Sequence, residues 1–303
     1  MTTPVFQEVG GKLLQSAIKK PWRLRAAEAT GRLLRHRMAM IGLTIVVASL
    51  LTAILAPFIA PYEPSAMDYR AMLKGPSAAH PLGTDDLGRD LLSRLIYGSR
   101  VSLSVGVSSV LIAVALGVPL GLITGYFRGA IDEVLMRVLD SVMALPALVL
   151  ALTIAAVLGQ GLINGVIAIA IVLVPVFTRL VRGQVLSVMH NDYVQAAHAV
   201  GVPTVLILVR HILPNIMNPV IVQASLSIGF AIILESSLSF IGLGAQPPTS
   251  TWGNMVQVGF QYLEIEPGFV LAPATLIFLV VLGFNMLGDG LRDLMDPMSL
   301  SRL

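Results

Sequence analysis

One carboxylate stands apart among the side chains that could do chemistry, because it interrupts a long uncharged stretch. Glu235 separates His211–Leu234 from Ser236–Leu263, and neither segment contains Asp, Glu, Lys or Arg. Small or polar residues recur at helical spacing around it, at Ala224, Ser227, Ala231 and Ser239. An acid on a membrane helix is costly and usually faces a cavity or a partner. Glu235, Ser227 and Ser239 are therefore predicted to line a solute path, with a structural hydrogen bond at a helix end as the equal alternative for Glu235.

A second group of charges lies nearer the N-terminus and contains Asp132, Glu133, Arg137 and Asp140. Arg137 and Asp140 are three positions apart, so they share one face of a helix and are expected to pair. The pattern favours a structural anchor at the inner membrane surface over a proton relay.

Catalytic and metal-binding signatures are absent from the sequence. It contains no G-x-S-x-G elbow, no H-E-x-x-H motif and no Walker A loop. With no cysteine, a disulfide framework, a Cys-ligated zinc site and an iron–sulfur cluster are excluded. The five histidines lack ligand spacing. We therefore expect no catalytic residue, no metal and no cofactor.

The composition points to a membrane protein. Of the 303 residues, 55% are hydrophobic and 12% are charged, whereas soluble domains carry roughly 25% charge. This balance excludes an ordinary cytosolic enzyme, and the high hydrophobicity excludes intrinsic disorder. The net charge of +3 is too small to indicate a nucleic-acid partner, so the expected environment is the lipid bilayer.

Uncharged stretches long enough to cross a bilayer predict six helices and an all-α integral membrane fold. The stretch Ser141–Thr178 is too long for one span and is divided at Gly159-Gln160-Gly161. Pro119, Pro146, Pro175 and Pro273 lie inside spans and predict kinks. The predicted helices are 38–60, 101–125, 134–158, 163–180, 216–240 and 268–288.

The distribution of Lys and Arg predicts that both termini are cytoplasmic, because most of the 20 basic residues fall on the side of the N-terminus. The chain then divides into a cytoplasmic segment 1–37, the first helix 38–60, an outer loop 61–100, a transport domain 97–290 and a cytoplasmic tail 291–303. Within the transport domain, 181–215 is an inner loop and 241–267 a second outer loop.

The second predicted helix carries small residues four positions apart, at Ser109, Ala113, Gly117, Gly121 and Gly125. Such a stripe allows two membrane helices to approach closely. It is interpreted as a packing surface.

The inner loop contains the most specific pattern in the chain. Asp192 is expected to cap a short Ala-rich helix that ends at Gly201, a preferred residue for a left-handed helix terminus. Pro203 then starts a second short helix, and Leu213-Pro214 leads back into the membrane. The sequence predicts a rigid helical elbow whose small side chains fit a groove on a partner.

This loop resembles the E-A-A-x3-G…L-P loop of permease subunits of type I ABC importers. The matching residues are Gln195, Ala196, Ala197, Gly201, Leu213 and Pro214. Three other stretches are similar to the C-type permease of dipeptide, oligopeptide and nickel systems: 80–94, 238–253 and 285–297. Gln195 stands where the family motif has its Glu. Gln keeps the capacity for hydrogen bonding but lacks the charge, so the resemblance does not imply an ion pair between this residue and an ATPase arginine.

The resemblance implies the type I permease fold and a coupling helix at 192–212 that docks on an ATPase subunit. It also implies a second homologous permease, two ATPase subunits that hydrolyse the ATP, and an extracytoplasmic solute-binding protein that faces the outer loops. The implied cellular location is the bacterial cytoplasmic membrane. The implied activity is import of dipeptides or short oligopeptides by alternating access. Glutathione, D,D-dipeptides, murein peptides and nickel are the other solutes of this class.

A stand-alone channel or secondary transporter is the rival hypothesis, with Glu235 and Asp140 as ion sites. It leaves the inner loop without a function, and no internal repeat supports an inverted-repeat transporter. An intramembrane enzyme is less favoured still, because no nucleophile–base pair is present.

Overall fold

The computed structural model describes residues 36–295. Their regular secondary structure is entirely helical, without any β-strand. A 3-10 turn, η1 (Tyr69–Ala71), lies in the loop after the first helix. The helices are α3 (Arg37–Ile59), α4 (Leu91–Phe127), α5 (Gly129–Met143), α6 (Ala147–Leu158), α7 (Leu162–Val188), α8 (Asp192–Ala199), α9 (Thr204–Leu206), the π-helical η2 (Ile207–Ile212), α10 (Leu213–Phe240), α11 (Trp252–Phe260) and α12 (Gly268–Met295).

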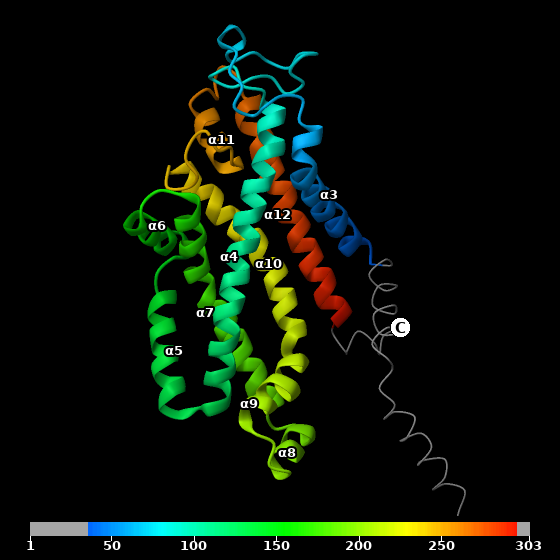
Figure 1. The fold of residues 1–303 in the computed structure, drawn as a ribbon, viewed down its shortest axis with the longest axis vertical. Helices are drawn as coiled ribbons and strands as arrows, with labels where there is room; N and C mark the ends of the chain where they lie inside the picture. The colour runs from blue at the N-terminus through cyan, green and yellow to red at the C-terminus, as the bar shows by residue number, and fades with distance from the viewer. Residues whose placement is uncertain (1–35, 296–303) are drawn as a thin grey trace, which may run out of the picture.

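The helices form an elongated bundle with different structures at its two ends (Figure 1). The short helix α8 projects at one end, which we call the α8 end. The loop 60–90 and α11 lie together at the other, which we call the α11 end. The predicted loops 61–100 and 241–267 are therefore neighbours, on the opposite side of the bundle from the predicted elbow.

Within residues 36–295, five helical stretches are long and apolar enough to span a membrane, and α5 with α6 makes a sixth if the two are counted together. They bend by 91° at the break, so the helix predicted over 134–158 is divided in two, and the kink predicted at Pro146 is a complete break. Pro146 is the cause: it disfavours helical geometry at Leu145, and its own extended ψ of 133° starts α6.

Several helices are longer than charge counting predicts: α7 and α12 extend past their predicted ends at 180 and 288, and two others begin earlier than predicted. α4 begins at Leu91 because the Asp90 carboxylate accepts from the Ser93 backbone N–H at 2.8 Å and caps the helix. At the α8 end, Thr204–Phe240 is one continuous stretch. The second short helix predicted after Pro203 therefore does not stop before the membrane. The π-helical turn η2 accommodates Pro214, which lacks the N–H that an unbroken α-helix would use.

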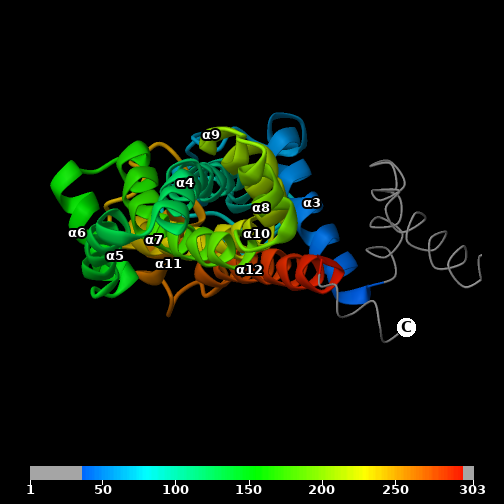
Figure 2. The same ribbon diagram turned by 90° about the horizontal axis from the view of Figure 1, so that it is seen from below.

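The small-residue stripe of α4 packs against α7, as predicted. A Cβ added at Gly117, Gly121 or Gly125 would lie 2.6–2.7 Å from the Cβ atoms of Phe177, Val181 and Val185, respectively. A similar approach joins α3 to α12, which are adjacent in Figure 2. There a Cβ at Gly42 would lie 2.5 Å from the Leu287 backbone nitrogen.

The charges around α5 pair differently from the sequence prediction. Arg137 pairs with Glu133 on the same helix, and Asp140 pairs with Arg179 of α7. The Asp132 carboxylate accepts from Nε and Nη2 of Arg182, both at 2.6 Å. The predicted Arg137–Asp140 pair is therefore wrong, but the predicted anchoring role fits, because these contacts fasten α5 to α7.

Candidate functional site

The elbow at the α8 end is built around a complete helix-termination motif. The Gly201 N–H donates to the His198 carbonyl and the Val202 N–H to the Ala197 carbonyl, both at 3.0 Å. Gly201 has a φ of +75°, as this motif requires. The prediction that the helix ends in a left-handed Gly201 is confirmed.

The start of α8 differs from the sequence prediction. Asn191 occupies the N-cap position, without a capping hydrogen bond from its side chain, and Asp192 is the first helical residue. Asp192 instead places its negative charge in the first turn, where the helix dipole favours it. Gln195 Nε2 donates to the His190 carbonyl at 3.1 Å. This bond requires a donor, so the amide of Gln195 ties down the start of α8 in a way that a carboxylate could not.

The two faces of α8 have different roles. Val194 and Ala197 are buried in the core of this chain, with Leu213 packed against the same core. The interpretation of Ala197 as a partner-facing residue is therefore wrong. Gln195 and Ala196 are exposed. Large apolar side chains are also exposed near the turn, at Tyr193, Val200 (79%) and Val205 (73%). We call Tyr193, Ala196, Val200 and Val205 the tip patch. Pro214 is exposed at the start of α10.

Two contacts that sequence reasoning missed join α8 to the end of α4. The Tyr126 hydroxyl lies 3.1 Å from His198 Nε2, and the two rings stack with centroids 5.9 Å apart. Arg128 Nη2 lies 3.2 Å from His190 Nε2. These residues are far apart in sequence and belong to no motif, so only the fold brings them together.

Glu235 sits in a closed hydrogen-bonded cluster near the α11 end of α10. Its carboxylate accepts from the hydroxyls of Ser239 at 2.8 Å and Ser102 at 3.2 Å. The Ser102 hydroxyl accepts in turn from the Trp252 backbone N–H at 3.2 Å, so the cluster joins α4, α10 and α11. Glu235 is 4% exposed, and the space beside it is about 10 Å³. Of the two roles predicted for Glu235, this geometry supports the structural hydrogen bond over the lining of a solute path.

Ser227 lies on the same helix but belongs to different surroundings. It is buried and accepts from Gln223 Nε2 at 3.2 Å. Gln223 lines a pocket of about 440 Å³, together with Gln184 and Asn218. The three predicted path residues are therefore not one site: Glu235 and Ser239 are together, and Ser227 adjoins a polar pocket of its own.

Replacing Glu235 tests its structural role. Glu235→Leu should leave the hydroxyls of Ser102 and Ser239 without their acceptor, and a buried polar group without its partner costs about 1–3 kcal/mol. The variant should therefore lower the melting temperature of the purified complex. Glu235→Gln keeps an acceptor oxygen and should assemble and transport like the unmodified chain. Loss of transport by Glu235→Gln, with assembly and melting temperature unchanged, would instead place Glu235 in the solute path.

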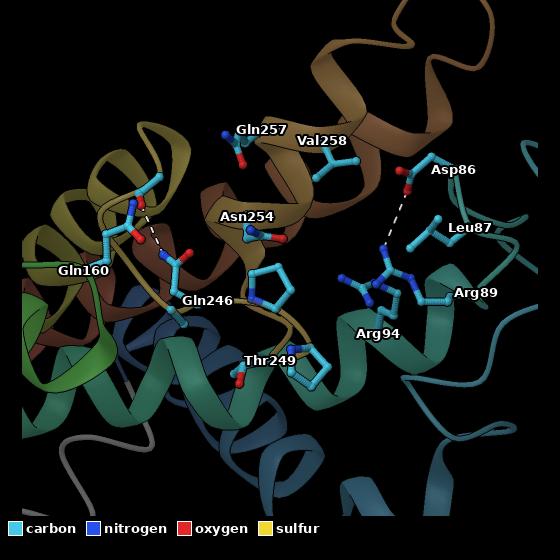
Figure 3. Close-up of a pocket in the computed structure, with 14 residues that line it drawn as sticks. Asp86, Leu87, Arg89, Arg94, Gln160, Gln246, Thr249, Asn254, Gln257 and Val258 are labelled. Carbon is cyan, nitrogen blue, oxygen red and sulfur yellow. Dashed lines mark hydrogen bonds and ion pairs between the residues drawn. The ribbon is translucent and has the colours of Figure 1, made fainter.

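The α11 end contains a pocket of about 390 Å³ that several polar side chains line (Figure 3). Its walls come from the segment 86–94, the α6–α7 turn, the loop before α11, and α11 itself. The polar side chains in these walls are Asp86, Arg89, Arg94, Gln160, Gln246, Thr249, Asn254 and Gln257.

A buried ion cluster forms one wall of this pocket. Asp85 Oδ2 lies 2.6 Å from Arg89 Nε and 3.4 Å from Arg94 Nε. Asp85 Oδ1 accepts from the backbone N–H groups of Leu87 and Arg89, both at 2.9 Å. Burial, followed by repulsion from Asp85, raises the pKa of the Asp86 carboxyl. Residues 80–94 were singled out in the sequence only by their resemblance to a family. In the structure they fold into a compact charged cap.

The fold and its two ends define a class of protein. The bundle is similar to a chain of the MetNI methionine ABC transporter in its inward-facing conformations, with a TM-score of 0.55 and 17% identity over 67% of this chain and 96% of that chain. The fold is that of a type I ABC importer permease. Within residues 36–295, no group of three or more His, Asp or Glu side chains could hold a metal ion.

Sequence relatives make the assignment specific. Residues 117–299 match the family "Binding-protein-dependent transport system inner membrane component", and residues 25–76 match the "N-terminal TM domain of oligopeptide transport permease C". The dipeptide transport system permease protein DppC of Alkalihalophilus pseudofirmus is 46% identical over 277 residues, 91% of this chain and 90% of that relative. The glutathione transport system permease protein GsiD of Shigella flexneri is 43% identical over 281 residues, 92% and 91% of the two chains. The chain belongs to this family of permeases of ABC importers.

Proposed function

We propose that the chain imports dipeptides or short oligopeptides as one permease of a binding-protein-dependent ABC importer. The observation that carries the proposal is the similarity to a dipeptide permease over nine-tenths of the chain. A glutathione permease is nearly as similar. Glutathione, D,D-dipeptides, murein peptides and nickel are therefore the solutes that a transport assay must compare with dipeptides.

The proposed assembly contains a second homologous permease, two ATPase subunits and an extracytoplasmic solute-binding protein. The family description itself refers to binding-protein-dependent transport. The chain has no Walker A loop, so ATP hydrolysis is assigned to the ATPase subunits and not to this chain.

The proposed orientation places the α8 end in the cytoplasm and the α11 end outside, in a bacterial cytoplasmic membrane. Arg179 and Arg182 near the end of α7, together with Arg128 and Arg210, flank the α8 end. Basic residues near span ends favour the cytoplasmic side. Both termini are then cytoplasmic, although 1–35 and 296–303 lie outside the described residues.

The tip patch is the proposed docking surface for an ATPase subunit. Its exposed apolar side chains surround the Gly201 turn, and Asp192, Gln195 and Ala196 are exposed beside it. Ala197, Leu213 and Pro214 act by holding the elbow in place. Because Thr204–Phe240 is one continuous helical stretch, movement of α8 by closing ATPases is transmitted toward the Glu235 cluster at the far end. Of the predicted path residues, Ser227 is the one that adjoins a sizeable pocket, through Gln223.

Co-purification and transport test this proposal together. The tagged chain should bring down a second permease and two P-loop ATPases, and the reconstituted complex should take up dipeptides only with ATP and its binding protein. Val200→Asp should lose the ATPases and keep the second permease, because it places a charge in the tip patch. Solute uptake by the chain alone, without ATPases, would support the channel or secondary-transporter hypothesis.

A further inference from the structure

The pocket at the α11 end has the size and construction of a ligand site. Its volume of about 390 Å³ lies within the range of roughly 300–1,000 Å³ that is typical of small-molecule sites. Three segments distant in sequence form it: residues 86–94, the α6–α7 turn, and the loop leading into α11 together with α11 itself. Figure 3 shows Arg94, Thr249 and Asn254 among the side chains that line the pocket. A molecule bound there would contact all three segments at once.

Two charged side chains of this pocket, one positive and one negative, each have a buried polar atom that forms no hydrogen bond within residues 36–295. Arg94 is 3% exposed, and its Nε pairs with Asp85 Oδ2 only at 3.4 Å, without forming a hydrogen bond; its Nη1 likewise reaches the Pro64 carbonyl only at 3.4 Å. Both oxygens of Asp85 are already engaged by Arg89 and by backbone N–H groups. The buried Oδ1 of Asp86 has no hydrogen bond either, and its ion-pair contact with Arg89 Nη2 is long, at 3.5 Å.

Neutral hydrogen-bonding groups complete the lining. The side-chain amides of Gln160, Asn254 and Gln257 line the space and form no hydrogen bond with another described residue. Each amide can both donate and accept. Gln160 is exposed and Asn254 and Gln257 are half-buried, so all three amides are accessible to a polar ligand.

We propose that this pocket binds a short zwitterionic peptide, with its carboxylate on Arg94 and its ammonium group near Asp86. A guanidinium fork suits a carboxylate, and an unpaired carboxylate suits an ammonium group. Asp85, Asp86, Arg89 and Arg94 sum to no formal charge, so a neutral zwitterion leaves the cluster electrically balanced, whereas an anion or a cation does not. The free amides would hold the peptide backbone.

The proposal rests on the proposed function, because it names the same class of solute, and it adds an outer binding site in the permease itself. Under the proposed orientation, the pocket opens on the side from which a binding protein would deliver its solute. The Gly161 N–H donates to the Leu243 carbonyl at 3.3 Å, so two of its walls are already in contact. A peptide that bridged them to Arg94 would stabilise the present arrangement of the outer segments.

Gln257→Glu is the decisive variant, with Gln261→Glu as its matched control. Both replace an amide on or next to α11 with a nearly isosteric acid, but Gln257 lines the pocket and Gln261 is exposed after the end of the helix. A carboxylate at 257 adds a negative charge to the lining of the pocket, which disfavours the carboxylate of the peptide. Neither variant alters the ion cluster, so both should fold.

The measurement is binding of Ala-Ala to the assembled permease–ATPase complex without binding protein. We expect Gln257→Glu to weaken binding at least roughly fivefold, and Gln261→Glu to leave it unchanged, because a solvent-exposed charge is screened. Ala-Ala-amide and N-acetyl-Ala-Ala should each bind more weakly than Ala-Ala. Equal binding by both variants, equal binding of the blocked peptides, or no binding of Ala-Ala would each overturn the proposal.

Uptake with the binding protein present separates this proposal from the proposed function. ATP-driven uptake of Ala-Ala without direct binding would overturn the pocket and leave the function intact. Direct binding that is sensitive to Gln257→Glu, without uptake, would support the pocket and overturn the peptide-import function. If Gln257→Glu weakens only the docking of the binding protein, the pocket receives a side chain of that protein, and the peptide proposal is overturned.

Discussion

Gly201→Val should leave the chain in the membrane but abolish the ATP hydrolysis that solute-loaded binding protein stimulates. Gly201 has a φ of +75°, and a Cβ added there would meet no atom within 4 Å. The effect is therefore backbone strain alone. That strain costs about 1 kcal/mol for a residue with a Cβ and more for a β-branched one. An eight-residue helix has little stability of its own, so strain of this size should unwind the end of α8 and misplace the tip patch.

Gly201→Asn is the matched control for this prediction, because Asn tolerates the left-handed conformation better than other residues with a side chain. It should retain most of the stimulated hydrolysis. Cross-linking to the ATPase should be measured from cysteine at the exposed Ala196, and it should fall with Gly201→Val and persist with Gly201→Asn. Wild-type transport by Gly201→Val would show that residues 192–212 do not couple ATP hydrolysis to transport.

The elbow shows which features of the site follow from local sequence. A helix that ends at Gly201 is predictable, because termination depends on residues within one turn of the chain. The cap was assigned to Asp192 instead of Asn191, since both residue types suit that position. The assignment of Ala197 to the partner-facing side failed for another reason. Which face of a short helix is buried depends on the core it packs against, and that core comes from η2, α7 and α10.

The buried charges show the limit of sequence analysis more sharply. Counting uncharged residues located the spans, but it started α4 too late, because it treated Arg100 as a boundary, whereas the helix begins at Leu91. The structure buries Arg94 in the helix beside Asp85. Likewise, Glu235 was recognisable as an unusual acid, yet its role depends on Ser102, which is 133 positions away. Pro146 predicted a kink, but not the size of the 91° bend between α5 and α6 or the ion pairs that fasten α5 to α7.

Gly121→Ala should have the largest effect on assembly, because it adds a single methyl group at the closest approach of α4 and α7. The new Cβ would lie 2.6 Å from Val181 Cβ and 2.7 Å from the Thr178 carbonyl oxygen. Neither atom can move by rotating a side chain, so the two helices must separate. Separation would also loosen the contacts at Gly117 and Gly125, which are nearly as short. Overpacking of this kind costs about 1–3 kcal/mol.

Gly183→Ala provides the matched comparison on α7. A Cβ at Gly183 would meet no atom within 4 Å, and alanine favours a helix over glycine by about 1 kcal/mol. The same chemical change should therefore lower the melting temperature and the yield of monodisperse complex at position 121, and leave both unchanged or raised at position 183. If the two variants melt at the same temperature, the glycine stripe does not fix the spacing of α4 and α7. The transport domain would then have to hold its two central helices together by the surrounding apolar side chains alone.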